Sequence, residues 1–508
     1  MSQRPNPPEP FKDLVDLASD ALGAFALFAT DDYFAEKENL LKPTAAEWIE
    51  GKYTDKGKWM DGWESQRRRV PGHDWAVIRL GVPGFVHGIV ADTTHFKGNA
   101  PQEVALEGID APDTATAAEL EASTGWAELL PRTAVKPDFQ NVLPLKAPSP
   151  RRVTHVRLHI YPDGGVARLR VYGVVDPAPR TFWRQGSADL AAVENGGTVV
   201  EVSDQFFGPP SNLLLPGRGV NMGDGWETKR RRTPGSDWAV IRLGRRGVLE
   251  RIELDTHFFK GNAPQAVLIE CLDEDEVGAA ELKARLRAPK GWDVLVAKSP
   301  LVQHRRHQLE PARPKPVTHL RVHIYPHGGV NRLRLYGHAL DTPAERERLD
   351  ELNAMDDREV AKLFTSLSGS KRWAQRLWEK RPFLSVRELF RLVDDVWWGL
   401  EPKDWLEAFA AHPRIGAKKA PKRESKEQSG MAAADAETKK RLAAVNEAYF
   451  EKFGFIFIVF ASGKSAAQML ELAEERVKNA KKVELENAAA EQAKITKLRL
   501  EKWLLNRS

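Results

Sequence analysis

The chain of 508 residues is too long for one hydrophobic core, and at roughly 150 residues per domain it predicts about three domains. Its 42% hydrophobic and 29% charged residues are typical of proteins folded in water, and no run approaches the roughly 18 apolar residues that a membrane span needs. The formal charge of +5 comes from 76 basic and 71 acidic side chains without a clustered basic stripe, which argues against a nucleic-acid partner.

The chain begins with a polar, proline-rich stretch, residues 1–14, which we predict to be disordered and which lacks an export signal. The single cysteine, Cys271, excludes an intrachain disulfide and a cysteine-rich metal site, and it favours a reducing compartment. We therefore expect a cytoplasmic protein with no membrane partner.

One motif organises the first two thirds of the chain, because it occurs twice. Asp-Gly-Trp-Glu stands at residues 61–64 and again at 224–227, and an Asp-Trp-Ala-Val-Ile-Arg-Leu-Gly block follows each copy. Short solenoid repeats recur at roughly 20–50 residues, so a repeat at this longer spacing predicts two domains of one fold. We place them at residues 15–178 and 179–342.

Each copy has the periodicity of β-strands. Ala76, Ile78 and Leu80 fall on one face and Trp75, Val77 and Arg79 on the other, which is the periodicity of a strand. A third shared block covers residues 92–101 and 255–264, in which the two histidines are out of step by one position. Each copy closes with alternating residues that run into a Pro-x-Gly-Gly turn. These patterns predict an antiparallel sandwich in each copy.

The pattern changes to a helical period over residues 343–508. Val360, Leu363, Phe364 and Leu367 share one helical face. Ser385 and Glu388 have the spacing of a capping box, which predicts the start of another helix. The sequence thus predicts a multidomain protein, two β-sandwich repeats followed by an all-α domain.

The doubled blocks, together with the His-Ile-Tyr-Pro segments that end at Pro162 and Pro326, resemble the allantoicase family over roughly residues 15 to 340. The resemblance implies two galactose-binding-like jelly rolls. It also implies an amidine hydrolase that converts allantoate to ureidoglycolate and urea.

Hydrolysis of this anion requires cationic groups, oriented donors and an acid/base pair. The candidates come from the shared blocks of both copies: Asp61, Glu64, Arg67, Asp92, His95, Lys97, Asn99, Asp224, Glu227, Arg230, Asp255, His257, Lys260 and Asn262. Structural roles compete with this interpretation, since the tryptophans can be core residues, the glycines turn residues and the arginine triplets solvated edges. No spacing supplies three metal ligands in one element, so we expect no metal, although Asp92 with His95 or Asp255 with His257 could contribute to a divalent site.

The helical region resembles a second family, OHCU decarboxylase, which acts on 2-oxo-4-hydroxy-4-carboxy-5-ureidoimidazoline (OHCU). The resemblance rests on segments such as His-Pro-Arg-Ile-Gly from residue 412, Glu-Gln-Ser-Gly from residue 427 and Phe-Gly-Phe-Ile-Phe-Ile from residue 453. It implies decarboxylation of OHCU to (S)-allantoin without a cofactor.

The second resemblance also implies roles for individual residues. His412 and Glu427 are the implied catalytic pair, and the implied substrate-binding residues are Pro413, Ser425, Gln428, Phe457, Ile458 and Arg499. The family places a serine three residues before the glutamate, whereas Ser425 lies two before it. The spacing of Trp405, Ala408, Phe409 and His412 independently points His412 inward.

We therefore predict a bifunctional enzyme of purine degradation that acts on the small ureides allantoate and OHCU and forms a homo-oligomer. The alternative is a pair of ligand-binding jelly rolls joined to a helical decarboxylase or scaffold domain. Sequence alone leaves open which jelly roll holds allantoate.

Overall fold

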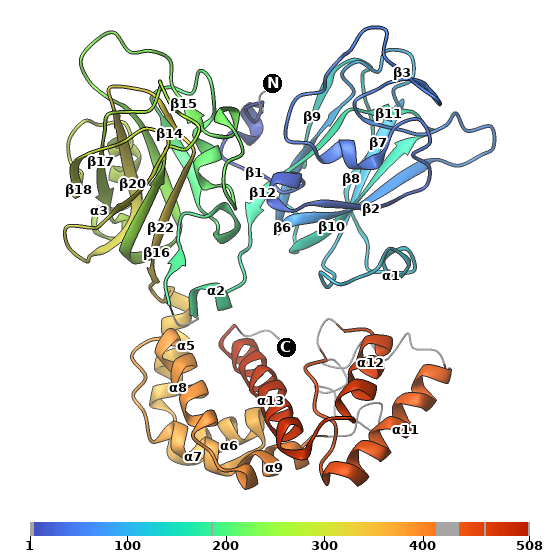
Figure 1. Ribbon diagram of the computed structural model, residues 1–508, viewed down its shortest axis with the longest axis vertical. Helices are drawn as coiled ribbons and strands as arrows, with labels where there is room; N and C mark the ends of the chain where they lie inside the picture. The colour runs from blue at the N-terminus through green and yellow to red at the C-terminus, as the bar shows by residue number, and fades with distance from the viewer. Residues whose placement is uncertain (1–4, 184–185, 413–435, 462–463, 506–508) are drawn as a thin grey trace. The chain divides into compact units, whose positions relative to one another are not determined.

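The computed structural model describes residues 5–183, 186–412, 436–461 and 464–505. Contacts divide the chain into two compact units: residues up to Phe182 with Gly186–Leu340, and Trp183 with the residues from Asp341 onward. The first unit consists of antiparallel sheets and the second of helices (Figure 1). The predicted fold class, two β-sandwich repeats followed by a helical domain, is confirmed.

The first repeat is built around one long strand, β6 (Asp74–Asp92). Its first half lies between β2 (Phe25–Ala29) and β10 (Val153–Tyr161), and its second half lies between β9 (Gln140–Pro144) and β12 (Arg168–Val175). The sheet is extended by β1 (Val15–Asp16) next to β12, and by β7 (Glu103–Ile109) and β8 (Ala127–Ala134) beyond β10. Because β6 changes partners half way along, one strand serves both parts of the sandwich.

The second repeat has the same topology around β16 (Asp237–Asp255). The order β13-β22-β16-β20-β17-β18 repeats the order β1-β12-β6-β10-β7-β8 of the first, and two further strands pair with β16. The strands are β13 (Ala188–Asp189), β14 (Thr198–Val202), β17 (Ala266–Leu272), β18 (Asp293–Pro300), β19 (Arg306–Leu309), β20 (Pro316–Tyr325) and β22 (Arg332–Ala339). The short helices α1 (Ala117–Glu121), α3 (Glu274–Val277) and α4 (Ala279–Arg285) lie in the connections, and α2 (Arg180–Trp183) follows the first repeat.

The alternation predicted for the shared strand is found in part, because Val77, on the face opposite Ala76 and Ile78, is also buried. Ala76 and Ile78 are fully buried, while Trp75 and Arg79 are half-buried on the other face. The tryptophan of the Asp-Gly-Trp-Glu motif is a core residue in both copies, since Trp63 and Trp226 are inaccessible to solvent. Each indole Nε1–H donates to a backbone carbonyl at 2.8 Å, that of Asp31 or Asp204. The motif is thus a signature of the fold.

The described part of the N-terminal stretch, residues 5–14, differs from the disorder predicted for residues 1–14, and residues 1–4 lie outside the described residues. Residues Glu9–Phe11 form a 3-10 helix, and the buried Phe11 ring stacks on Tyr172 at 4.9 Å between centroids. The polar, proline-rich composition of this stretch hid one aromatic residue, Phe11, whose ring packs on Tyr172 of β12.

The helical unit contains eight helices among the residues described from Asp341 onward. They are α5 (Pro343–Ala354), α6 (Asp357–Ser368), α7 (Lys371–Trp378), α8 (Val386–Trp398), α9 (Pro402–Ala410), α11 (Ala436–Phe453), α12 (Ala466–Arg476) and α13 (Lys481–Leu504). The predicted cap of α8 is present, because the Ser385 hydroxyl accepts from the Glu388 N–H at 3.1 Å. The Glu388 carboxylate reaches the N–H of Leu384 instead of Ser385, so the box is not reciprocal. No described helix has the length and apolarity needed to traverse a lipid bilayer.

Candidate active site

Two short ribbons bring the shared blocks together in each repeat. In the first, β5 (Trp63–Glu64) pairs with β11 (Gly165–Val166), and the Gly165 N–H donates to the Asn99 carbonyl at 2.7 Å. The Asn99 amide then donates to Glu64 Oε1 at 2.6 Å. In the second, β15 (Trp226–Glu227) pairs with β21 (Gly329–Val330), and Asn262 donates to Glu227 Oε1 at 2.5 Å. The fold therefore places a glutamate against an asparagine in both copies.

Glu64 has the electrostatics of a proton donor or acceptor. Burial raises the pKa of its carboxyl, and the hydrogen bond from Asn99 partly offsets that effect by stabilising the carboxylate. A carboxyl whose pKa is raised holds its proton at a higher pH than an exposed glutamate does. That property suits general acid/base chemistry.

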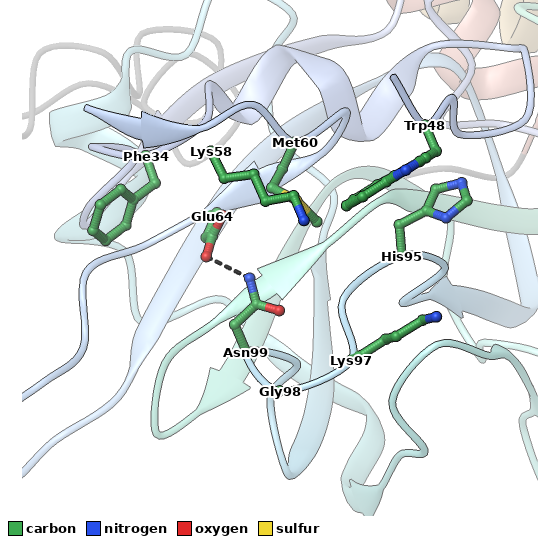
Figure 2. A pocket seen from close by; sticks show the side chains of 9 residues that line it. All are labelled: Phe34, Trp48, Lys58, Met60, Glu64, His95, Lys97, Gly98 and Asn99. Atoms are coloured by element: carbon green, nitrogen blue, oxygen red, sulfur yellow. Dashed lines mark hydrogen bonds between the residues drawn. The ribbon is translucent and has the colours of Figure 1, made fainter. Parts of the chain in front are cut away.

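A cavity of about 590 Å³ opens beside this glutamate (Figure 2). Four of the sequence candidates line it, Glu64, His95, Lys97 and Asn99, and they are joined by Phe34, Trp48, Lys58, Met60 and Gly98. In Figure 2 the Trp48 indole lies beside the His95 imidazole, and Lys58 extends next to Met60. The first copy thus combines an acid/base group, an imidazole and two ammonium groups around one space.

His95 owes its position to an uncommon backbone conformation. Its φ is 73°, and its N–H donates to the Asp138 carboxylate at 2.8 Å. Its ring lies 5.6 Å from the Trp48 ring, and Nε2 lies 3.4 Å from the Ala46 carbonyl. The neighbouring Lys97 is 3.7 Å from Asp138.

The second copy has different side chains at the same backbone positions. Phe258, with φ 70°, stands where His95 stands, and its N–H donates to His304 Nδ1 at 2.9 Å. His257 comes one residue earlier and pairs with the Asp255 carboxylate at 2.6 Å. The one-position offset between the histidines is therefore a real structural difference: His95 lines the cavity beside Glu64 and Asn99, whereas His257 is paired with Asp255.

The aspartates of the repeated motif do not line the cavity. Asp61 receives the guanidinium of Arg168 at 2.5 Å and the ammonium of Lys42 at 2.7 Å, and Asp224 pairs with Arg332 at 2.8 Å. Burial would raise the pKa of Asp61, but the hydrogen bonds from Lys42 and Arg168 outweigh burial and lower it. Asp61 therefore belongs to a buried ion pair, and Asp224, which is partly exposed, pairs with the buried Arg332.

Several other candidates are occupied or exposed. Asp92 accepts from Thr94 Oγ1 at 2.5 Å and from Gln140 at 3.2 Å. Arg67, Arg230 and Lys260 are exposed, and the second arginine of each triplet forms the ion pair, Arg68 with Asp74 and Arg231 with Asp237. Among the described residues, no cluster of three or more His, Cys, Asp or Glu side chains could hold a metal ion.

Sequence reasoning missed one wall of the cavity. Trp48, Lys58 and Met60 belong to the segment between Leu41 and Asp61, which spans residues 42–60 in the first copy, whereas the second copy has only residues 215–223 there. The ten-residue difference in length between these two segments (19 against 9) could have indicated this wall of the cavity. A comparison restricted to the shared blocks does not detect it.

In the helical unit, His412 follows the end of α9. Its N–H donates to the Phe409 carbonyl at 3.1 Å, and Phe409 is fully buried against Phe455 at 5.5 Å between rings. His412 itself is half-buried. The predicted residues Pro413, Ser425, Glu427 and Gln428 lie outside the described residues.

The other predicted decarboxylase residues are buried. Phe457 and Ile458 are each 3% exposed, and Arg499 is 4% exposed and donates to the Leu367 carbonyl at 3.3 Å. The Ile458 carbonyl accepts from Arg476 at 2.9 Å. Arg476 also pairs at 2.6 Å with Glu484, which accepts from Tyr449. This buried cluster was absent from the sequence predictions, because its members are far apart in the chain and carry no motif.

Comparison with known proteins identifies the families to which the two parts of the chain are similar. The allantoicase repeat model matches residues 15–176 and 188–340, and the OHCU decarboxylase model matches residues 353–501. A probable allantoicase 1 of Burkholderia mallei is 45% identical over 339 residues, which cover 66% of this chain and 97% of the relative. The allantoicase of Dictyostelium discoideum is 42% identical over 334 residues, 65% of this chain and 89% of the relative. The crystal structure of Saccharomyces cerevisiae allantoicase superimposes with a TM-score of 0.56 and 36% identity, covering 64% of this chain and 94% of that one.

Fold, cavity and matches together define a multidomain enzyme of purine degradation, with a hydrolase part and a decarboxylase part. The chain belongs to the allantoicase family and also carries an OHCU decarboxylase domain. The alternative of ligand-binding jelly rolls is not favoured, because the allantoicase similarity spans both repeats.

Proposed function

We propose that the first repeat hydrolyses allantoate to ureidoglycolate and urea in the Glu64 cavity, and that the helical domain decarboxylates OHCU to (S)-allantoin. The observation that supports the hydrolase site is the meeting of Glu64, His95, Lys97 and Asn99 around one cavity. The second copy keeps the Glu-Asn pair but has Phe258 in place of the histidine. This difference favours the first copy.

In this mechanism Glu64 acts as the acid and then as the base. Its protonated carboxyl gives a proton to the ureido nitrogen that leaves, and the bond from that nitrogen to the central carbon breaks. The lone pair of the second ureido nitrogen stabilises the cationic carbon. A water oxygen then bonds to this carbon and returns one proton to the Glu64 carboxylate, so urea and ureidoglycolate form and the acid is restored.

Asn99 orients this carboxyl. Its amide donates to Glu64 Oε1, which leaves the other oxygen free of that bond and able to face the substrate. His95 supplies a ring nitrogen to the same cavity, and as an imidazole it can donate to a ureido carbonyl.

For the decarboxylase, His412 and Glu427 are the proposed acid/base pair. Arg499 would bind a carboxylate through its planar guanidinium, as the family resemblance implies. Pro413, Ser425, Gln428, Phe457 and Ile458 complete the proposed site. We further propose that neither reaction uses a cofactor, and that the enzyme is a cytoplasmic homo-oligomer.

Urea release from allantoate tests the hydrolase assignment, with Glu64→Gln and Glu227→Gln as a matched pair. Both changes remove a carboxyl that accepts a hydrogen bond from an asparagine side chain, Asn99 or Asn262. Loss of the acid/base group should lower kcat of Glu64→Gln by roughly 10²–10⁴-fold, whereas Glu227→Gln should stay near the unmodified enzyme. Equal loss in both variants would overturn the assignment to the first copy, and no urea from the unmodified enzyme would overturn the hydrolase function.

A further inference from the structure

The first copy carries a structural element without a counterpart in the second, and we call residues 42–60 the arm. It contains the hairpin of β3 (Tyr53–Thr54) and β4 (Gly57–Lys58). The corresponding residues 215–223 of the second copy, all of them described, contain no strand. The two copies therefore differ in two ways: the first contains an inserted segment, the arm, and some of its side chains differ from those of the second.

The base of the arm is fixed to the sandwich by the buried Arg168. This guanidinium donates to the Thr44 carbonyl at 2.9 Å and to the Ala45 carbonyl at 3.2 Å. The Glu47 N–H donates to Asp61 at 3.0 Å. The Asp61–Arg168 pair thus holds the arm in one place as well as stabilising the core.

The arm presents three lysines over aromatic rings. Lys52 lies 3.7 Å from the Trp59 ring centroid, Lys56 lies 5.1 Å from that of Tyr33, and Lys58 lies 4.1 Å from that of Trp48. Of these, the pair of Lys58 and Trp48 lines the cavity, opposite Asn99 (Figure 2).

Lys58 is the cation best suited to a ligand. Its ammonium lies on the Trp48 ring, and within the described parts of the chain no carboxylate forms an ion pair with it. Lys97, the other cavity lysine, has a side chain that is 78% exposed and faces Asp138 at 3.7 Å. Lys97 also has a counterpart in the second copy, Lys260, whereas Lys58 has none.

We propose that Lys58, held on Trp48 by the arm, binds the substrate's carboxylate and makes the site specific for an anionic diureide. This inference rests on the proposed hydrolysis of allantoate in the first copy. Allantoate carries one carboxylate and two flat ureido groups on a single carbon. With the carboxylate at Lys58, the central carbon lies between that wall and the Glu64–Asn99 pair. Trp48 acts as a positioning residue, since it contacts both Lys58 and His95.

The test compares Lys58→Met with Lys52→Met and Lys56→Met. Each change removes one ammonium over an aromatic ring of the same region, and only Lys58 lines the cavity. Two ligands are used: allantoate, and diureidomethane, which has the same two ureido groups without the carboxylate. The readouts are KM and kcat for urea release from allantoate, and the inhibition constant of diureidomethane against allantoate.

We expect Lys58→Met to raise KM for allantoate by roughly 10-fold or more, because a charge-assisted contact to the carboxylate is lost. The inhibition constant of diureidomethane should change by less than about 2-fold, since it has no carboxylate. Lys52→Met and Lys56→Met should leave both constants unchanged, and Lys58→Arg should restore most of the lost affinity.

The inference is wrong if Lys58→Met leaves KM for allantoate unchanged, or if it weakens both ligands equally. A failure of the unmodified enzyme to release urea would instead refute the proposed function. Thermal unfolding of all three methionine variants shows whether a kinetic change comes from loss of the fold, which would affect Lys52→Met as well.

Discussion

His95 and Phe258 occupy the same backbone position in the two repeats. Their φ angles are 73° and 70°, and the N–H of each donates to the side chain of a residue that itself has a positive φ, Asp138 at 50° and His304 at 52°. The two copies share the backbone conformation at this position but differ in the side chain that it carries. The repeated motif therefore fixes a scaffold, and the side chains on that scaffold decide which copy reacts.

The pH dependence of urea release should report on Glu64. As the acid, Glu64 must be protonated, so activity falls as pH rises through its raised pKa. Asn99→Ala removes a hydrogen bond that lowers this pKa, so the pH at which kcat/KM falls on the alkaline side should move to a higher value. Measuring kcat/KM for urea release as a function of pH locates this alkaline decrease. A shift to lower pH, or none, would exclude Glu64 as the titrating acid.

Breaking the buried ion pair of the first copy should destabilise the protein strongly. Asp61 and Arg168 have side chains that are 5% and 1% exposed, so Asp61→Asn leaves a guanidinium buried without its counter-charge. We expect a loss of about 3–5 kcal/mol in the free energy of unfolding. Asp224→Asn is the matched comparison: Arg332 is also buried, at 3% exposed, but Asp224 is 24% exposed, so water partly screens this pair and its loss should cost less. Guanidinium unfolding followed by circular dichroism gives both values.

The close approach of Gly165 to Phe96 leaves no space for a side chain. A methyl group at Gly165 would overlap the Phe96 ring, which is fully buried, whereas a methyl group at Gly261 would meet nothing within 4 Å. Gly165→Ala should therefore cost roughly 1–3 kcal/mol or more, and Gly261→Ala little. Differential scanning calorimetry of both variants checks this difference. Equal melting temperatures would show that the ring moves away freely.

Acid should destabilise the sandwiches through two equivalent histidines. Burial lowers the pKa of His155 and of His319 to about 4, from the usual 6.5. Between these two values the unfolded chain binds more protons than the folded one, so the free energy of unfolding falls as pH drops from 6.5 towards 4. His155→Gln should make stability less dependent on pH over this range. Denaturant titrations at pH 7 and pH 5 measure the effect, and an unchanged pH dependence would contradict it.

The two activities should be separable by single substitutions. His412→Asn should abolish the stereoselective formation of allantoin, because the proposed acid/base imidazole follows α9 in the helical unit, while urea release should persist. Glu64→Gln should have the converse effect. Polarimetry on freshly generated OHCU and a urea assay on allantoate measure the two. A parallel loss of both activities in either variant would show that the parts do not act independently.

The fold could be predicted from sequence because periodicity is local. The alternation at Ala76 and Ile78 predicted strands, and the face formed by Val360 and Phe364 predicted helix, without knowledge of any distant contact. Two copies of one pattern also predicted two copies of one topology. The burial of Phe11 was missed, because a polar, proline-rich composition says nothing about one aromatic residue within it.

The candidate site was predicted in part. Glu64, His95, Lys97 and Asn99 lie in shared blocks and were all proposed from sequence. Asp61 was proposed with them, but its partner Arg168 is 107 residues away, and no local pattern reveals such a pair. Lys58 and Trp48 were missed for a different reason: they lie in the segment that the copies do not share, and a repeat directs attention to what recurs.

The unequal segments before Asp61 and Asp224 have a consequence for the number of hydrolase sites per chain. If the arm confines hydrolysis to the first copy, every chain carries one hydrolase site and one decarboxylase site despite its three domains. Active-site titration with a tight inhibitor would then saturate at one equivalent per chain. Synthesis as one polypeptide would then keep the number of hydrolase sites equal to the number of decarboxylase sites at any level of expression.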